Sequence, residues 1–299
     1  MSAPPSRDDA AGRAYNDLRN KARAAHRPTQ ELLQLYLLEA FLRRLAGSSH
    51  RQNLVLKGGV LLAALGDRRP TKDVDLQARQ LSNDADTTTR VILEIARLAA
   101  DDGVAFDTEA ATTEIIREDD GYRAYRVRMP ASLATANLRF AVDISVGDPI
   151  EPSPQLVQLP CLLTEDTIAL VGYPIVMVHA EKLVTALQRG TVNTRWRDFA
   201  DIWTLSRHWD CGGTELQSAL TTVAGYRGAA LEAIFPAPPL WPVWLGPPAR
   251  RPSAMSCAVP RWRWFGRRSS CWACPAREPS SSFSSGCARR SSRPFGLRP

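Results

Sequence analysis

Lysine, histidine and long apolar runs are all scarce in this chain of 299 residues. The sequence contains four histidines and only four lysines, which are Lys21, Lys57, Lys72 and Lys182. The opening stretch MSAPPSRDDAAGR has no apolar segment of signal-peptide length, and the apolar run at residues 60–65 is too short to cross a bilayer. We therefore expect a soluble, cytoplasmic protein without a membrane partner.

Acidic residues are nearly absent from the end of the chain, which changes the meaning of the net charge of +7. Residues 236–299 contain 11 arginines, no lysine and one acid, Glu278, a net charge of +10. Subtracting +10 from +7 leaves residues 1–235 at −3, with 27 basic and 30 acidic side chains. Because binding to a nucleic-acid backbone needs clustered Lys and Arg, the body of the protein must rely on local patches for any such contact.

Regular periodicity is missing from residues 236–299, which hold 12 of the 22 prolines, 5 of the 8 tryptophans and 4 of the 6 cysteines. Three explanations compete: a disordered basic arm, a small Cys-rich metal module, and a product of the wrong reading frame of a GC-rich gene. Cys271 and Cys274 form a C-x-x-C pair, but no second pair follows at zinc-site spacing. We favour a disordered or frame-shifted tail. Cys161 and Cys211 stand singly and are expected to be buried thiols in a reducing compartment.

The remaining residues form a strand-bearing half followed by a helical half. With 44% hydrophobic residues the chain can bury a core. Apolar periodicity and caps predict helices at residues 7–26, 29–46, 60–66, 84–102, 178–189, 195–208 and 214–225. Alternation and turn signals predict strands at residues 53–56, 72–78 and 139–147, and a hairpin of residues 107–118 and 122–129.

Two aspartates carry the first chemical signal, at the end of the stretch KGGVLLAALGDRRPTKDVDL, residues 57–76. Asp73 and Asp75 lie two residues apart in a predicted strand, so their side chains project from the same face. Two carboxylates so close repel each other unless a cation lies between them. Mg²⁺ prefers a few such oxygen ligands together with water and substrate phosphates. The pair therefore predicts a magnesium site.

Two further features fit such a site. Asp143 lies in the centre of the apolar strand FAVDISV, and if this strand neighbours the first one, three carboxylates converge as two-metal phosphoryl transfer requires. The turn Gly58-Gly59 allows close approach of the backbone to phosphate, and the helix after it favours anions.

Each feature alone has a plainer explanation. A D-x-D pair often occurs by chance at an exposed strand edge, Asp143 could cap a loop or pair with an arginine, and Gly-Gly is more often a simple turn. The order strand, Gly-Gly, helix, D-x-D strand and later strand acid is much less expected by chance, and we interpret the set as functional.

The helical half supplies a second group of charged residues. VHAEKLVTALQRG places His179, Lys182 and Arg189 along one side of a helix, and Lys182 could reach triphosphate oxygens or form a salt bridge. TRWRDFADIW places Asp198 and Asp201 on one helix face, where a local ion-pair set is the alternative to catalysis. His179 is more often a structural histidine than a ligand.

Together, these blocks resemble the AbiEii/MenT family of nucleotidyltransferase-like toxins over roughly residues 30–225. The blocks are KGGVLL…RPTKDVDL, VDI, HAEKL…R and RDFADI. The resemblance implies an α+β fold: a minimal nucleotidyltransferase fold, with a mixed sheet and flanking helices, followed by a helical domain. The implied domains are N-terminal helices at 1–46, a nucleotidyltransferase domain at 47–172, a helical domain at 173–235 and an atypical tail at 236–299. Relatives continue with helices where this chain has its Pro-, Arg- and Ser-rich tail.

The resemblance also implies an Mg-dependent enzyme, the toxin of a toxin–antitoxin system. It would transfer a nucleotide from an NTP to the 3′ acceptor end of tRNA and so block translation. The implied partners are the NTP, the tRNA acceptor end and a cognate antitoxin, and we expect a monomer. The alternatives are a small-molecule nucleotidyltransferase of the aminoglycoside type, and an inactive truncated or frame-shifted relative that acts only by binding.

Carried over to this sequence, the resemblance assigns roles to individual residues. Its catalytic residues would be Asp73, Asp75, Lys182, and Asp198 or Asp201. Its metal ligands, for Mg²⁺ or Mn²⁺, would be Asp73, Asp75 and Asp143. Its nucleotide-binding residues would be Lys57, Gly58, Gly59, Arg68, Thr71 and Arg189. At the position of Thr71 some relatives carry a serine that is phosphorylated through the antitoxin.

Overall fold

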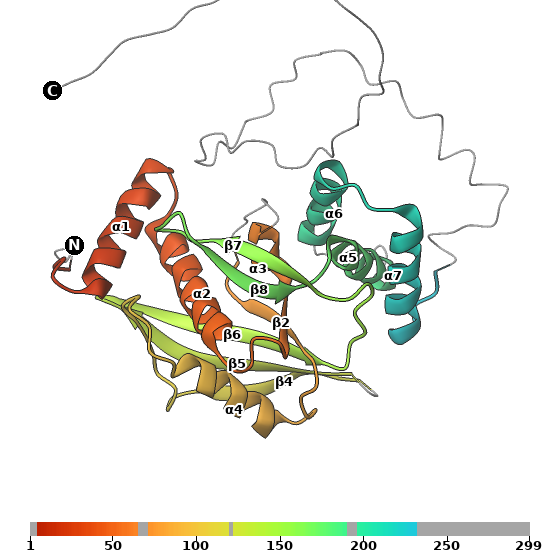
Figure 1. The fold of residues 1–299 in the computed structure, drawn as a ribbon, viewed down its shortest axis with the longest axis horizontal. Coiled ribbons are helices and arrows are strands. Elements are labelled where there is room, and N and C mark those ends of the chain that lie inside the picture. Colours follow the sequence, from red (N-terminus) through yellow and green to blue (C-terminus); the bar gives the residue numbers. More distant parts are fainter. Residues whose placement is uncertain (1–4, 65–70, 120–121, 190–195, 232–299) are drawn as a thin grey trace, which may run out of the picture. The chain divides into compact units, whose positions relative to one another are not determined.

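The computed structural model describes residues 5–64, 71–119, 122–189 and 196–231 (Figure 1). The chain divides into two compact units, Met1–Ser253 and Ala254–Pro299, and all described residues belong to the first. The predictions about the tail, including Cys271 and Cys274, lie outside the described residues. The four-part domain division remains a prediction.

Eight strands of the described residues form one sheet. In chain order they are β1 (Leu54–Lys57), β2 (Val74–Ala78), β3 (Val104–Phe106), β4 (Thr112–Asp119), β5 (Tyr122–Leu133), β6 (Ala136–Val146), β7 (Gln155–Pro160) and β8 (Thr167–Gly172). Their spatial order is β3-β5-β6-β2-β1-β8-β7, with β4 paired to β5. β2 runs parallel to β6 and β1 parallel to β8, whereas the other pairs are antiparallel. The sheet is therefore mixed, as predicted.

The N-terminal helices cover part of this sheet. α1 (Ala10–Ala24) begins where the Asp9 side chain accepts a hydrogen bond from the Gly12 N–H at 2.6 Å, a typical N-cap. α2 (Thr29–Gly47) contacts β6 and β8, and most of its leucines are fully buried (Figure 1). Phe41 of α2 lies against Phe106 and Phe140 of the sheet, with ring centroids 6.3 and 4.7 Å away. α2 is therefore a central core helix, which explains its nearly continuous apolar sequence.

The next helix ends earlier than predicted, and a buried ion pair lies just beyond its end. α4 (Ala85–Ala96) ends six residues before the predicted limit at residue 102. Arg44 donates to both carboxylate oxygens of Asp102, at 2.6 and 3.2 Å, and both side chains are about 95% buried. Asp102 also accepts from the Val104 N–H at 3.0 Å, where β3 begins. The long-range pair thus holds residues 101–106 in a non-helical path that local periodicity does not reveal.

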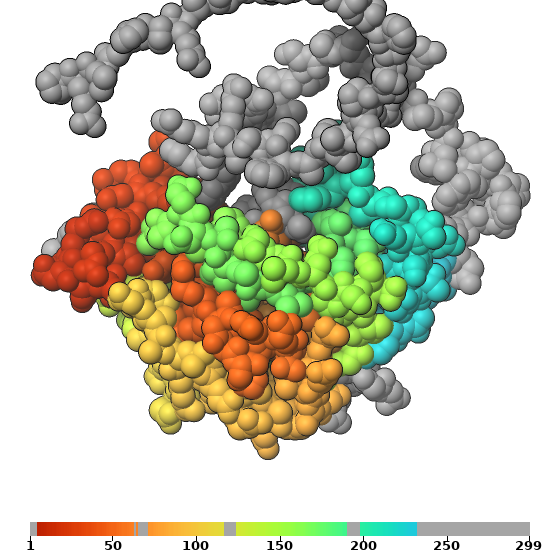
Figure 2. Space-filling view, viewed as in Figure 1, coloured from red at the N-terminus to blue at the C-terminus, as the bar shows by residue number. Residues whose placement is uncertain are grey.

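β7 and β8 were not predicted, although they complete the sheet beside β1. Buried and exposed positions alternate along both strands, and Leu156 of β7 remains 67% exposed. The space-filling view shows the green segment of these strands at the surface next to the orange α2 (Figure 2). Alternation over only six residues, ending at Pro160, is a weak signal without the partner strand.

The helical half contains α5 (Ile175–Arg189), α6 (Trp196–His208) and α7 (Gly213–Tyr226), close to the predicted limits. α5 packs against both α6 and α7. α3 (Gly58–Ala64) follows β1 directly and contacts β2 and β7. Across the described ranges, no helix combines the length and hydropathy needed to span a membrane.

Candidate active site

The Gly58 turn brings the end of β1 against the side chain of Asp75. Gly58 has a φ of +67°, a conformation that residues with a Cβ rarely adopt. A Cβ at this position would lie 1.9 Å from Asp75 Oδ2, and the Asp75 carboxylate accepts a hydrogen bond from the Gly59 N–H. Gly58 is thus required for the close approach of a carboxylate, in addition to any contact with phosphate.

A row of charged side chains crosses five neighbouring strands at the level of Asp75. The row consists of Lys57, Asp75, Asp143, Arg126 and Glu114, which lie on β1, β2, β6, β5 and β4. Each of these residues is the direct cross-strand partner of the next. Residues directly opposite each other point to the same face, with Cβ atoms about 5 Å apart. The two strand acids therefore lie side by side, which fulfils the condition that the sequence left open.

The sequence analysis did not select two members of this row, Glu114 of β4 and Arg126 of β5. The Arg126 guanidinium donates to both oxygens of Asp143, with Nε–Oδ1 and Nη2–Oδ2 distances of 2.5 Å. Arg126 Nη2 also lies 3.8 Å from Asp73 Oδ2. The alternation in YRVRM could have indicated that Arg126 and Arg128 share one face, but not which acids they meet.

Burial and mutual repulsion perturb the paired aspartates. Burial raises the pKa of Asp75 to about 6, the Lys57 charge acts against this shift, and the Asp143 charge adds to it. Burial and the Asp143 charge also raise the pKa of Asp73, while Arg126 acts against them. Carboxylates that are costly to ionise in a cleft are typical of sites that bind a cation or perform proton chemistry.

The donor set partly fits a divalent metal ion. Asp75 in β2 and Asp73, one residue before β2, offer hard carboxylate oxygens, which suit Mg²⁺ or Mn²⁺. Asp143 does not fit as a ligand while Arg126 engages both of its oxygens. Within the described residues no group of three or more His, Cys, Asp and Glu side chains is arranged to hold a metal ion.

Lys57, which was predicted to bind nucleotide, is engaged by protein groups. Its Nζ donates to Ser145 Oγ at 2.6 Å and lies 3.4 Å from Asp148 Oδ2. It also lies 3.9 Å from Glu181 Oε1 of α5, and Arg227 Nη2 contacts the same Glu181 oxygen at 3.1 Å. In this arrangement Lys57 links the sheet to the helical half.

The second group of predicted residues meets between α5 and α6. Lys182 Nζ lies 3.3 Å from Asp198 Oδ1 and 2.7 Å from Asp201 Oδ2, and all three side chains are largely buried. Asp198 Oδ2 is buried without a hydrogen-bond partner among the described residues. His179 is buried on the same helix as Lys182, and burial lowers its pKa. Asp198 and Asp201 thus both neutralise Lys182 between the two helices.

The remaining predicted residues lie near these groups or outside the described ranges. Thr71 Oγ1 donates to the carbonyl of Asp73 at 3.3 Å, so it lies beside the paired acids. Arg189 is the last residue of α5. Arg68 lies outside the described residues. The candidate residues therefore form a sheet group around Asp75 and a helix group around Lys182, joined by the ion pair between Lys57 and Glu181.

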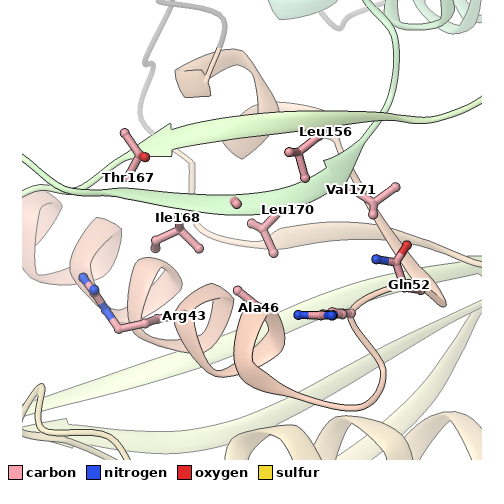
Figure 3. A pocket seen from close by; sticks show the side chains of 10 residues that line it. Arg43, Ala46, Gln52, Leu156, Thr167, Ile168, Leu170 and Val171 are labelled. Atoms are coloured by element: carbon pink, nitrogen blue, oxygen red, sulfur yellow. The ribbon is translucent and has the colours of Figure 1, made fainter.

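A groove of 340 Å³ lies elsewhere on the fold, between α2 and the strands β7 and β8 (Figure 3). Figure 3 shows Arg43 and Ala46 of α2 on one side, and Leu156, Ile168 and Leu170 of the strands on the other. Its lining contains none of the predicted site residues, and we do not assign it to the candidate active site.

A mixed sheet that presents paired aspartates after a Gly-Gly turn, followed by helices with a lysine–aspartate group, defines a nucleotidyltransferase-like protein. The family model described as the nucleotidyl transferase AbiEii toxin of type IV toxin–antitoxin systems matches residues 40–254, more than half of the chain. The chain belongs to this family. This match confirms the resemblance and the fold class inferred from the sequence. Membership supports a nucleotide-transferring enzyme with an NTP as substrate and an antitoxin as partner.

Solved structures that are similar to this chain include two proteins. JHP933 from Helicobacter pylori is 19% identical, with 67% of this chain and 80% of that chain covered and a TM-score of 0.42. An antigenic nucleotidyltransferase-like protein from Paracoccidioides brasiliensis is 18% identical, with 65% and 89% covered and a TM-score of 0.37. No curated protein matches the chain.

Proposed function

We propose that this protein is a toxin that transfers a nucleotide from an NTP to the 3′ acceptor end of tRNA and thereby blocks translation. The observation that carries the catalytic part is the placement of Asp75 of β2 against the Gly58 turn, with Asp73 one residue before this strand. Asp143 and Arg126 lie next to them in the row of charges. We expect a cytoplasmic monomer that pairs with an antitoxin.

The sheet group provides the metal and phosphate side of the reaction. Asp73 and Asp75 would hold Mg²⁺ or Mn²⁺, with Asp143 as a third carboxylate. The ion, when bound, neutralises charge on the triphosphate. Gly58 and Gly59 hold the start of α3 against Asp75, so the phosphates of a nucleotide bound through a metal ion on Asp75 would lie beside this turn. As in other phosphoryl transfers, these residues mainly position groups and neutralise charge.

The helix group provides the charge and the base. Lys182 is held by two carboxylates and contributes a positive charge toward the triphosphate. The acceptor hydroxyl attacks the α-phosphorus, a new P–O bond forms, the bond to the β-phosphate oxygen breaks and pyrophosphate leaves. The hydroxyl proton passes to Asp198 or Asp201, the two acids beside Lys182, and the other acid fixes Lys182.

An aromatic stripe on α6 favours an RNA end over a small molecule as the acceptor. Phe199 and Trp203 lie four residues apart on one helix face and are 42% and 60% exposed. The Arg207 guanidinium lies 4.6 Å from the centre of the Trp203 ring. Unstacked RNA bases bind to aromatic rings and arginine planes of this kind. The stripe lies on the same helix as Asp198 and Asp201, so a single-stranded end stacked there would lie on the helix that carries these acids.

Thr71 supports control by modification through the antitoxin. Its hydroxyl lies beside Asp73, to whose carbonyl it donates a hydrogen bond. A phosphate at this position would add negative charge next to acids whose pKa values are already raised, and would repel the incoming triphosphate.

The test is incubation of the purified protein with labelled NTP and either total tRNA or an aminoglycoside. We expect labelled tRNA, loss of label with Asp73→Ala, and a raised KM for tRNA at unchanged kcat with Trp203→Ala. Leu156→Ala, which removes another exposed apolar side chain on β7, is the matched control and should behave as wild type. Labelled aminoglycoside in place of tRNA would refute the RNA acceptor, and no product with either acceptor would favour an inactive binding protein.

A further inference from the structure

Arg126 occupies the position where a cation between the sheet acids is expected. Its side chain is 27% exposed, and it binds Asp143 through two parallel hydrogen bonds while approaching Asp73 at 3.8 Å. A bidentate pair of this kind is among the stronger ion pairs in proteins, because two charge-assisted bonds share one fixed plane. The guanidinium therefore neutralises the same carboxylates that a divalent ion would neutralise.

A metal ion and Arg126 need the same oxygens of Asp143. Both oxygens accept hydrogen bonds from the guanidinium, and a divalent ion on the same oxygens would bring a second positive charge against it. We propose that Arg126 is an internal counter-cation that competes with the divalent ion for Asp143, so that metal ligation by Asp143 opens the Arg126–Asp143 pair. This inference rests on the metal site of the proposed function.

The displaced guanidinium has a defined second role. Arg126 belongs to the same row of charges as Asp75, so after release it remains on the substrate side of the sheet. A guanidinium binds phosphate oxygens in a bidentate manner, as it binds a carboxylate. Metal binding therefore makes Arg126 available for the triphosphate. By linkage, metal and phosphate each strengthen the binding of the other through this side chain.

The same strand offers a matched control. Arg128 lies two residues after Arg126, on the same face, and pairs with Glu114 at 2.6 Å with both side chains about half exposed. Arg126→Gln and Arg128→Gln remove the same charge from the same strand face, but only the first frees Asp143. A general charge effect would change the Mn²⁺ affinity of both variants, whereas competition for Asp143 changes the Mn²⁺ affinity of Arg126→Gln alone.

The experiment measures Mn²⁺ binding to the full chain from the EPR signal of free Mn²⁺, without turnover. We expect Arg126→Gln to bind Mn²⁺ about tenfold more tightly than wild type, and Arg128→Gln to stay within about twofold. In an Asp143→Asn background, Arg126→Gln should increase the affinity for Mn²⁺ much less, as a double-mutant cycle requires for coupled residues. Pyrophosphate should strengthen Mn²⁺ binding in wild type and much less in Arg126→Gln.

Several results would overturn the proposal. Unchanged or weaker Mn²⁺ binding by Arg126→Gln would do so, as would an equal gain in Arg128→Gln. Circular dichroism first establishes that the variants fold, and Arg126→Lys, which keeps the charge but not the fork, should give an intermediate affinity. If Asp73→Ala abolishes Mn²⁺ binding while Arg126→Gln equals wild type, only this inference fails. If wild type binds no Mn²⁺, the metal site of the proposed function fails as well.

Discussion

Gly58→Ala perturbs the close approach of the β1 turn to Asp75. The added Cβ would lie 1.9, 2.5 and 2.7 Å from the Oδ2, Cγ and Cβ atoms of Asp75. Rotation of the Asp75 side chain could relieve the contacts with Oδ2 and Cγ but not the contact with Cβ, because β2 is paired on both sides, to β1 and to β6. A left-handed conformation costs an L-residue about 1–2 kcal/mol, and an overpacked site costs about 1–3 kcal/mol more. The variant should therefore lose about 2–5 kcal/mol of unfolding free energy.

Urea unfolding measures the loss of stability, and nucleotide transfer at a temperature where the variant is folded measures the effect on the site. We expect transfer to fall by about 10²-fold, because a shift of about 1 Å in a reacting group has this effect. Gly47→Ala is the control, since a Cβ at the end of α2 meets nothing within 4 Å. It should change stability by less than about 1 kcal/mol. Wild-type stability and activity in Gly58→Ala would refute the assigned contact with Asp75.

Three further predictions concern buried charges. The folded-state pKa of Asp75, about 6, lies above its ordinary value of 3.8, so ionisation of Asp75 destabilises the fold as pH rises from about 4 to above 6. In metal-depleted buffer, the free energy of unfolding of Asp75→Asn should therefore rise relative to wild type by up to about 3 kcal/mol between pH 4 and pH 7. A difference in unfolding free energy that does not depend on pH would contradict this. Asp102→Asn leaves Arg44 without its buried carboxylate and should cost about 3–5 kcal/mol in urea unfolding, whereas the exposed neighbour Asp101→Asn should cost little; equal losses would show that the pair is unimportant. Lys182→Met should lower kcat/KM for the NTP by about 10²-fold or more, and an unchanged value would remove Lys182 from the site.

Much of the candidate site was readable from local sequence. The D-x-D spacing predicted Asp73 and Asp75 on one strand face because strand side chains alternate, whereas β2 begins at Val74 and includes only Asp75. The helices were predictable from their periodicity, and the predicted limits of α6 and α7 differ from the observed ones by one residue. The order of the blocks identified the family without any knowledge of the contacts between them.

The contacts that decide the chemistry depend on residues far apart in the chain. Arg126 and Asp143 are 17 residues apart, and Lys57 and Ser145 are 88 apart, so no local pattern pairs them. The same is true of Arg44 and Asp102, whose buried pair lies just beyond the end of α4.

The sequence by itself therefore determined which residues are chemically capable and on which faces of their own elements they lie, because that information is carried by short spacings. Only the tertiary structure decided that the two parallel strands β2 and β6 are neighbours. It also decided that Arg126 neutralises Asp143 and that Gly58 makes room for Asp75. Strand pairing and close packing arise from the whole chain, and they determine which charges meet.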